Sequence, residues 1–217
     1  MPLKHLTSYL QNSRLALWHI TESRQELEDK LHLIDRSDLT REEHFKSEKR
    51  NFEWLATRNM LAVIVDEKAG IEYDDCGKPH LINFPGHLSI SHSWPYVCIF
   101  YHPEKAAGVD IELMNDRILK IRKKFVNDSE ELWLKDVEEI KGLFLIWAAK
   151  EAVFKMLGGG GILFKEHLEL KQVDLSIKGK ATICFMKEKT HQDFTIYYEF
   201  LDDMILVYTI ANDQEVV

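Results

Sequence analysis

The chain has 217 residues, of which 45% are hydrophobic and 29% are charged, an ordinary globular composition that argues against a disordered protein. A chain of this length buries roughly 70% of its unfolded surface and needs no disulfide to hold its core together. Asp and Glu total 36 against 28 Lys and Arg, for a net charge of −8, which argues against nonspecific binding to nucleic acid.

The N-terminal part is predicted to contain a short and a long helix among strands. The short helix begins at Thr21, and its apolar residues keep helical spacing as far as Ile34. The long helix begins at Thr40, because Thr40 and Glu43 have the spacing of a capping box, and it ends before Gly70. The other predicted elements here are strands at residues 15–20, 88–92 and 96–101 and a turn at 74–79.

The C-terminal part is predicted to place helices before strands again. A short strand at 108–113 precedes a helix for which Asn127, Asp128 and Ser129 all offer caps, and a long helix then covers residues 142–157. That helix ends at the four glycines 158–161, which lack the Lys-Ser/Thr of a Walker-type phosphate loop. Alternating apolar residues predict a meander of strands at 168–177, 181–186, 194–200 and 205–210.

The fold class follows from this order of elements. In both parts a long helix precedes several strands, although no repeat of individual residues accompanies the order. We predict an α+β fold of two similar halves, residues 1–104 and 105–217, each with a long helix on a small, mainly antiparallel sheet.

Cysteines and apolar stretches predict the compartment. The cysteines, Cys76, Cys98 and Cys184, have no paired spacing, which favours a reducing environment. The first residues contain no apolar run resembling a signal peptide, and the longest apolar stretches, 142–149 and 204–211, are too short to span a bilayer. We therefore expect a cytoplasmic protein that has no membrane partner.

Asp110 and Glu112 lie on one face of the predicted strand at 108–113, while Val109 and Ile111 point into the core. Two carboxylates on one face repel each other unless a cation or an exposed surface relieves the repulsion. A solvated strand end is the simpler interpretation, but the apolar residues between the acids favour a partly buried strand.

Trp147, Glu151 and Lys155 follow one another at intervals of four on the long helix and lie near one face. A surface Glu–Lys pair is the simplest interpretation of that spacing. The Ala, Val and Phe residues around them indicate instead that these charges lie near a packed surface.

Ser91 and His92 offer hydrogen-bond donors for phosphate oxygens. A Ser–His hydrolase is poorly supported, because neighbouring residues on a strand face opposite sides and no Gly-x-Ser-x-Gly motif is present. His87 and His102 have no spacing that would make them metal ligands.

Four motifs, in this order, resemble those of the 4'-phosphopantetheinyl transferase superfamily, in its longer, pseudodimeric, surfactin-synthetase-activating (Sfp-type) form. They are Gly-Lys-Pro at 77–79, Ile-Ser-His-Ser at 90–93, Gly-Val-Asp-Ile-Glu at 108–112 and Trp-Ala-Ala-Lys-Glu-Ala-Val-Phe-Lys at 147–155. The resemblance implies a pseudo-twofold fold in a monomer, with the active site in the cleft between the halves.

The resemblance also implies an activity. Such enzymes move the 4'-phosphopantetheine arm of coenzyme A to a serine of an apo acyl or peptidyl carrier protein in fatty acid or secondary metabolite biosynthesis, releasing adenosine 3',5'-bisphosphate. By this match Asp110, Glu112 and Glu151 hold Mg²⁺, which prefers hard oxygen ligands. Glu151 is also the candidate base, and Lys155 would stabilise the phosphate under attack, with Lys150 as a second candidate for that role.

Coenzyme A itself would contact residues of the N-terminal half. By the same resemblance Lys78, Ser91 and His92 bind its phosphates, and Arg50 or Arg58 meets the 3'-phosphate. The chain departs from the family pattern at Trp94, where glycine commonly follows the Ser-His-Ser run. The region with Glu130 and Glu131 is similar to the family's carrier-docking area.

Two other functions remain open from the residues alone. A non-catalytic protein with the same fold could bind coenzyme A or a carrier protein. A metal-dependent phosphohydrolase could use the same carboxylates, although the sequence offers no second metal cluster for it.

Overall fold

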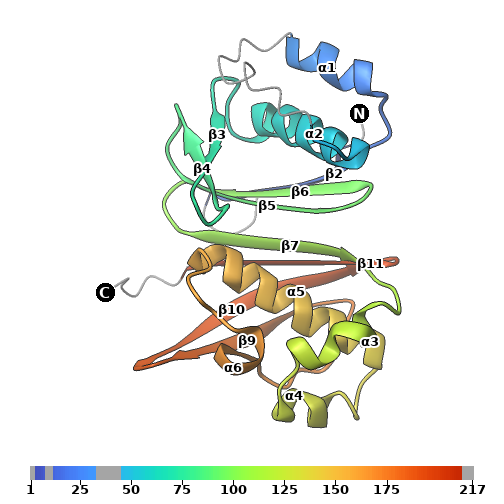
Figure 1. Cartoon of the computed structure of the whole chain (residues 1–217), viewed down its shortest axis with the longest axis vertical. Coiled ribbons are helices and arrows are strands. Elements are labelled where there is room, and N and C mark those ends of the chain that lie inside the picture. The colour runs from blue at the N-terminus through green and yellow to red at the C-terminus, as the bar shows by residue number, and fades with distance from the viewer. Residues whose placement is uncertain (1–2, 8–11, 33–44, 212–217) are drawn as a thin grey trace. The chain divides into compact units, whose positions relative to one another are not determined.

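The computed structural model describes residues 3–7, 12–32 and 45–211. The chain divides into two compact units, Met1–Lys105 and Ala106–Val217, here called the N-terminal and C-terminal units (Figure 1). Each unit combines helices with antiparallel strands, which confirms the α+β class. No helix among the described residues is long and apolar enough to cross a membrane.

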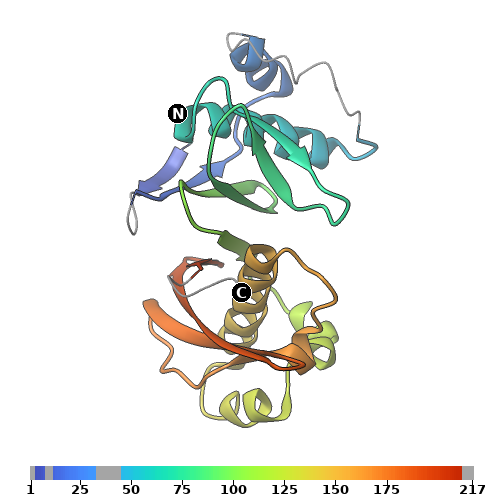
Figure 2. The same ribbon diagram turned by 90° about the vertical axis from the view of Figure 1, so that its left-hand side faces the viewer.

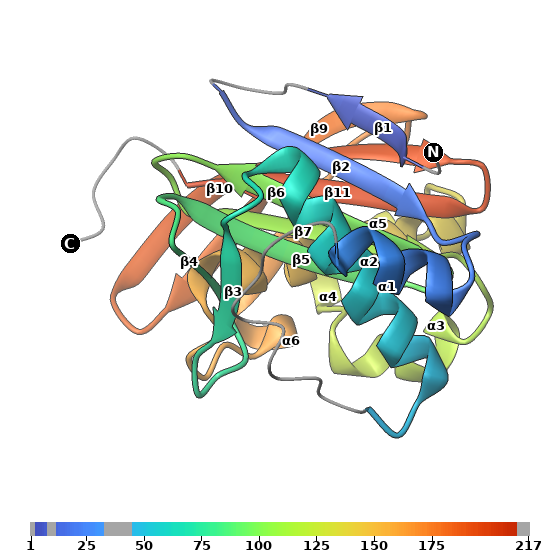
Figure 3. The same cartoon turned by 90° about the horizontal axis from the view of Figure 1, so that it is seen from above.

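The N-terminal unit has a four-stranded sheet in the order β1-β2-β6-β5, with all neighbouring strands antiparallel. Figure 3 shows helices α1 and α2 lying over this sheet. The strands are β1 Leu3–Thr7, β2 Arg14–His19, β5 His87–Ser93 and β6 Tyr96–His102, and the helices are α1 Arg24–His32 and α2 Glu48–Ile64. A separate hairpin pairs β3 Gly70–Tyr73 with β4 Pro79–Ile82.

The core of the N-terminal unit lies between α2 and the sheet. Leu61 and Met60 of α2 are fully buried in one cluster with Ala16 and Trp18 of β2. In this cluster Ala56, Met60 and Ile64 recur at helical spacing on α2, and Ala16 and Trp18 alternate on β2, so each element turns one face to the other.

Helix α2 begins at Glu48, which corrects the predicted start at Thr40. Phe45 is not helical, and its backbone N–H and C=O are both bound by the side chain of Asn51, at 3.1 Å each. Thr40 and Glu43 lie outside the described residues.

Helix α1 begins at Arg24, three residues later than predicted. Ser23 and Glu26 form the capping box there, because the Ser23 N–H donates to the Glu26 carboxylate at 2.7 Å and the Glu26 N–H to the Ser23 hydroxyl at 3.3 Å. Ile34, the predicted end of its apolar stripe, lies outside the described residues.

The C-terminal unit has a five-stranded antiparallel sheet in the order β7-β11-β10-β9-β8. In Figure 2 the long helix α5 lies against one face of it. The strands are β7 Ala107–Leu113, β8 Leu168–Leu170, β9 Lys178–Lys187, β10 Thr190–Leu201 and β11 Met204–Ile210. The helices are α3 Ile118–Ile121, the 3₁₀ turn η2 Arg122–Lys124, α4 Asp128–Trp133, α5 Glu139–Leu157 and α6 Phe164–His167.

Helix α5 lies unusually close to strand β7. Ala148, Ala149 and Ala152 are fully buried on α5. A Cβ atom on Gly108 of β7 would lie 1.9 Å from the carbonyl oxygen of Ala152, so the strand backbone touches the helix backbone where glycine removes the obstacle. This contact brings the side chains that follow Gly108 up to the helix.

The C-terminal helices lie near their predicted positions. Of the three residues that could cap α4, Asn127 does so, in a capping box with Glu130. Helix α5 begins three residues before its predicted start and ends at Gly158, which has a φ of 83° and closes the last turn through its N–H to the Phe154 carbonyl at 3.1 Å.

The strand predicted at 168–177 is wrong beyond residue 170. After Leu170 the chain is no longer a strand, and between its backbone bonds at Lys171 and Ile177 two of its carbonyl groups accept from side chains. The Trp133 indole donates to the Val173 carbonyl at 3.0 Å, and the Tyr198 hydroxyl to the Asp174 carbonyl at 3.3 Å.

Candidate active site

Asp110 and Glu112 extend from β7 toward α5. They pair in register with Val207 and Ile205 of β11, which belong to the core between α5 and the sheet, so all four side chains share that face. Asp110 is only 3% exposed and Glu112 is half-buried. The interpretation as a solvated strand end is therefore wrong for Asp110.

Lys155 crosses from α5 to the strand. Its ammonium group donates to Asp110 Oδ1 at 2.7 Å and to the Val109 carbonyl at 3.2 Å. The lysine thus places a positive charge beside the most buried of the site's carboxylates.

Glu151 lies one helical turn before Lys155 and is half-buried. Burial raises the pKa of its carboxyl to about 7, and the charges of Asp110 and Glu112 add to the rise while Lys155 opposes it. No hydrogen bond or ion pair reaches this carboxylate from the described residues. Three acidic side chains from two elements thus act on one another electrostatically.

Trp147 holds Glu112 in place from the same face of α5. Its indole Nε1–H donates to Glu112 Oε1 at 2.9 Å. Its ring packs against Phe125 and Phe164, with centroids 5.1 Å and 5.5 Å away. The fourfold spacing on the helix predicted that Trp147 lies on this face, but not its hydrogen bond to Glu112, because spacing along a helix does not show which strand residue lies opposite.

The donor set fits a hard divalent cation. Carboxylate oxygens are the ligands that Mg²⁺ prefers, and a cation relieves the repulsion that raises the pKa of Glu151. The ligand oxygens of Asp110, Glu112 and Glu151 do not all lie within 4.8 Å of one another. A shared cation would draw the half-buried glutamates toward Asp110.

The N-terminal unit contains a cavity of about 470 Å³, a volume suited to a small molecule. It lies at the junction of α2, strand β5 and the β3–β4 hairpin. Its lining includes Arg50, Glu53, Trp54, Arg58, Gly77, Pro79 and His92. Three of the residues predicted to bind coenzyme A therefore meet at one cavity, namely Arg50, Arg58 and His92.

The arginines of this cavity are held differently. Arg50 Nη1 contacts His92 Nε2 and lies 3.5 Å from the Glu53 carboxylate. Arg58 is 6% exposed, its guanidinium lies 4.4 Å from the centre of the Trp54 ring, and its Nε finds no hydrogen-bond partner among the described residues. A buried guanidinium with an unused donor is suited to an anion.

Lys78 and Ser91 lie beside this cavity and are not among its lining residues. The turn before Lys78 is fixed by Asp74, whose Oδ1 accepts from the Lys78 N–H at 2.9 Å and whose Oδ2 contacts His80 Nε2 at 2.9 Å. The His80 contact lowers the pKa of Asp74. Ser91 is 5% exposed on β5.

Trp94 does not line the cavity either. Its ring packs edge-on against Phe52, at 5.8 Å between centroids, and Lys49 Nζ lies 5.9 Å from the ring centre. Trp94 therefore extends the apolar surface of α2.

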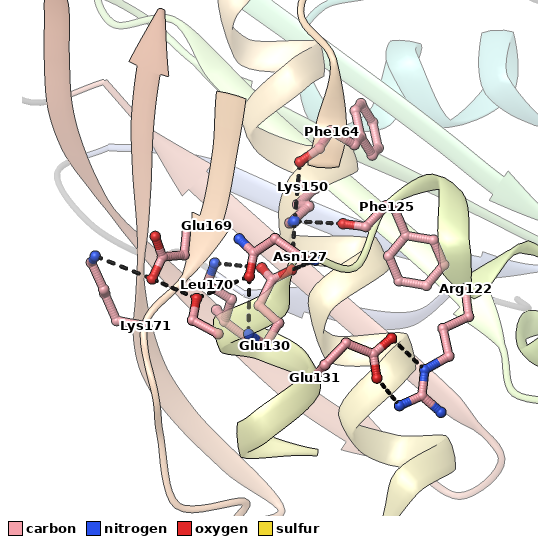
Figure 4. A network of polar contacts seen from close by, with 11 residues as sticks. Arg122, Phe125, Asn127, Glu130, Glu131, Lys150, Phe164, Glu169, Leu170 and Lys171 are labelled. Atoms are coloured by element: carbon pink, nitrogen blue, oxygen red, sulfur yellow. Dashed lines mark hydrogen bonds and ion pairs between the residues drawn. The ribbon is translucent and has the colours of Figure 1, made fainter. Parts of the chain in front are cut away.

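Lys150 cannot serve as the second phosphate-binding lysine. Its side chain is fully buried, and its ammonium group donates to the Glu130 carboxylate at 2.8 Å and to the carbonyls of Phe125 at 2.6 Å and Phe164 at 3.0 Å. Figure 4 shows these bonds joining Lys150 to Phe125, Glu130 and Phe164. Lys150 and Glu151 are neighbours in sequence but face different sides of α5.

Glu130 and Glu131 both form ion pairs within the C-terminal unit. Glu130 is buried beside Lys150, and Glu131 forms an ion pair with Arg122 (Figure 4). Burial raises the pKa of Glu130, against the opposing effect of Lys150. Both side chains hold α4 and its neighbours together.

Comparison with known proteins finds a similarity in the C-terminal unit. Residues 106–208, which lie within the C-terminal unit, match the model of the 4'-phosphopantetheinyl transferase superfamily. The chain is 31% identical over 115 residues to 4'-phosphopantetheinyl transferase gsp of Aneurinibacillus migulanus, over 50% of this chain and 47% of that protein. The chain thus covers about half the length of this curated relative.

The C-terminal unit is therefore similar to the 4'-phosphopantetheinyl transferase superfamily over residues 106–208.

Proposed function

We propose that the protein transfers the 4'-phosphopantetheine arm of coenzyme A to a serine of an apo acyl or peptidyl carrier protein. The observation that carries this proposal is the grouping of Asp110, Glu112, Glu151 and Lys155 between β7 and α5. It occurs in the unit that matches the superfamily.

The reaction breaks one phosphoanhydride bond and forms one phosphoester bond. The serine oxygen bonds to the phosphorus that carries the pantetheine arm, adenosine 3',5'-bisphosphate leaves, and the serine proton passes to a base. Bound Mg²⁺ would neutralise charge on the pyrophosphate. Asp110, Glu112 and Glu151 supply the oxygen atoms that would hold it.

The chain's own side chains prepare this site before any substrate binds. Trp147 orients Glu112 through its 2.9 Å hydrogen bond, and Lys155 holds Asp110 through its 2.7 Å ion pair and adds positive charge near the phosphate oxygens. The pKa of about 7 also suits Glu151 to accept a proton at neutral pH. Coordination lowers basicity, so we assign Glu151 first as a metal ligand and second as the base.

The cavity of the N-terminal unit is proposed to bind the nucleotide part of coenzyme A. Arg58 offers a buried guanidinium with an unused donor, and Arg50 and His92 lie beside it. A phosphate group would receive charge-assisted hydrogen bonds from these side chains. Lys78, next to the cavity, is proposed to contact further phosphate oxygens. Ser91 is not assigned this role, because its side chain lies on the face of β5 opposite Ile90 and His92, which line the cavity.

The direct test is incubation with coenzyme A, Mg²⁺ and an apo carrier protein, followed by intact-mass analysis of the carrier. We expect a phosphopantetheine adduct, and none when Mg²⁺ is removed with a chelator. Glu151→Gln is expected to abolish transfer, whereas Glu188→Gln, at an exposed turn between β9 and β10, should transfer normally.

Other outcomes would point to the alternatives. Tight binding of coenzyme A without an adduct on any carrier would indicate a non-catalytic binding protein, and phosphate release without a carrier would indicate a phosphohydrolase. Undiminished transfer by Glu151→Gln would overturn the metal assignment. We further propose that the enzyme acts in the cytoplasm as a monomer with internal pseudosymmetry.

A further inference from the structure

A second cluster of metal-binding side chains lies on the other face of the C-terminal sheet. Cys184 on β9 pairs directly with Asp193 on β10, and His191 lies two residues before Asp193 on the same strand. The neighbours Ile183 and Phe194 belong to the core beneath α5. Because side chains alternate along a strand, Cys184, His191 and Asp193 share the face of the sheet opposite α5.

The ligand atoms of this cluster are already close together. The Cys184 sulfur, a His191 ring nitrogen and an Asp193 carboxylate oxygen all lie within 4.8 Å of one another. Cys184 Sγ is 2.9 Å from His191 Nε2, which is 3.9 Å from Asp193 Oδ1. Among the described residues, these three are the His, Cys, Asp or Glu side chains whose ligand atoms come this close together as a group of three.

We propose that Cys184, His191 and Asp193 form a binding site for a transition metal ion such as Zn²⁺. A thiolate, an imidazole and a carboxylate are the three ligand types that zinc takes, at about 2.0 to 2.3 Å. Ligand atoms around one tetrahedral ion lie roughly 3 to 4 Å apart by this geometry, so small side-chain rotations suffice.

The backbone favours the same conclusion. The β9–β10 ladder runs without interruption from the pair Thr190–Lys187 to the pair Glu199–Lys178, so the two strands hold the ligands at fixed separation. Cys184 is 1% exposed, whereas the His191 and Asp193 side chains are 69% and 59% exposed. The sulfur therefore forms the floor of the site, and an ion enters from solvent between the other two ligands.

The chemistry differs from that of the carboxylate site. Mg²⁺ does not favour sulfur, while softer ligands select zinc, cobalt or copper over magnesium. Glu169 lies opposite Cys184 on β8, and its carboxylate is engaged by the Ser129 hydroxyl at 3.0 Å and by Lys171 at 3.5 Å. Three protein ligands with solvent in the fourth position complete the site.

Cobalt provides the test, because Co²⁺ occupies zinc sites and its bond to a thiolate absorbs in the near ultraviolet. The full-length, untagged protein is treated with a chelator, kept reduced with a non-thiol reductant and titrated with Co²⁺. We expect a thiolate charge-transfer band that saturates at one ion per chain. Cys184→Ser should lose the band, whereas Cys76→Ser, which removes the exposed thiol, should keep it.

A second set of variants changes the two exposed ligands, His191 and Asp193, whose side chains are not part of the core. Loss of an outer-shell partner weakens metal binding about 10- to 100-fold. His191→Ala and Asp193→Asn each remove a direct ligand, so each is expected to weaken Co²⁺ binding by more than that. Added Zn²⁺ should displace Co²⁺, and excess Mg²⁺ should not. Glu151→Gln should keep the band, so this result stands apart from the test of transferase activity.

Several outcomes would overturn the proposal. No band at saturating Co²⁺, a band that persists in Cys184→Ser, or a band lost in Cys76→Ser would each show that these three residues do not form the site. Unchanged affinity in both His191→Ala and Asp193→Asn would do the same.

Discussion

The two units of this protein build the same kind of strand–helix pair with opposite chemistry. In each unit the strand that precedes the long helix pairs with the unit's last strand, β2 with β6 and β7 with β11. The positions that face the helix are Ala16 and Trp18 on β2, but Asp110 and Glu112 on β7. Topology therefore fixes where side chains meet the helix, and a few residues decide whether that place becomes core or site.

The buried charges of the two long helices also differ. On α2, Arg58 is 6% exposed beside the cavity, and its Nε has no hydrogen-bond partner among the described residues. On α5, the Lys150 side chain is fully buried and paired with the Glu130 carboxylate at 2.8 Å. Buried ions are costly unless paired and hydrogen-bonded, so loss of Lys150 should be costly because it leaves Glu130 unpaired.

Lys150→Met is expected to have the largest effect. It leaves the Glu130 carboxylate buried without its cation, and loss of one partner of a buried pair costs about 3–5 kcal/mol of unfolding free energy. Urea unfolding measures the change. Lys141→Met, on the same helix at a lysine that is 43% exposed, should stay within about 0.5 kcal/mol.

The double variant Lys150→Met/Glu130→Gln separates charge from packing. The amide oxygen of the introduced glutamine can still accept the Leu170 N–H that Glu130 accepts at 2.8 Å. We expect the double variant to recover part of the loss. A double variant less stable than Lys150→Met would show that Lys150 acts mainly by filling space.

Gly108→Ala breaks the strand–helix contact itself. The added methyl group would lie 1.9 Å from the Ala152 carbonyl oxygen, so α5 must move away from β7. We expect a loss of about 3 kcal/mol, at the upper end for overpacking, and loss of most transfer activity. Strand β2 contains no glycine, so no matching substitution exists in the N-terminal unit.

A control for Gly108→Ala is Gly160→Ala. Gly160 has open space around it but a φ of 58°, so alanine there should cost only about 1–2 kcal/mol and leave transfer intact. Equal losses at both positions would mean that the contact with Ala152 is not what makes Gly108 necessary.

The raised pKa of Glu151 should make the stability of the C-terminal unit depend on pH. Its pKa is about 7 in the folded protein against an ordinary value of 4.5, so the folded state binds more protons between these values. Metal-free stability should therefore fall as pH rises from about 4.5 to 7. One pKa unit corresponds to about 1.4 kcal/mol, and we expect about 2–3 kcal/mol in all.

The difference between wild type and Glu151→Gln isolates this contribution. The variant should lack it and be the more stable of the two above pH 7, while Glu188→Gln should follow wild type. Urea unfolding in a chelator at several pH values measures the curves. If the unfolding free energies of wild type and Glu151→Gln change with pH in parallel, the pKa of Glu151 is not raised in the folded protein.

The sequence predicted which residues share a face, but not how the elements meet. Alternation along β7 correctly put Asp110 and Glu112 on one face, because that rule acts within one element. It did not show that this face is the one toward the core under α5, which was expected on the side of Val109 and Ile111. The ion pair of Lys155 with Asp110 joins residues 45 positions apart, and no local pattern specifies it. The burial of Lys150 likewise depends on the distant carbonyls of Phe125 and Phe164, so its sequence position did not exclude a phosphate-binding role.

Trp147→Phe should have the smallest effect on stability of these substitutions, and it has a matched counterpart in the N-terminal unit. Phenylalanine keeps the ring contacts and removes the Nε1–H that donates to Glu112. Loss of one hydrogen bond to a charged group is worth about 1.5 kcal/mol, so transfer should fall roughly tenfold and need more Mg²⁺ for half its maximal rate. Unfolding free energy should change by less than about 1 kcal/mol, because the bond is only part-buried.

Trp18→Phe is the matched control, because the Trp18 indole also donates to a carboxylate, Glu22, at 3.3 Å. It lies on β2 at a position that faces α2, as Glu112 on β7 faces α5. We expect Trp18→Phe to leave the Mg²⁺ dependence of transfer unchanged. An equal shift in both variants would mean that these indoles act on overall stability, whereas a shift in Trp147→Phe alone assigns Trp147 to positioning Glu112.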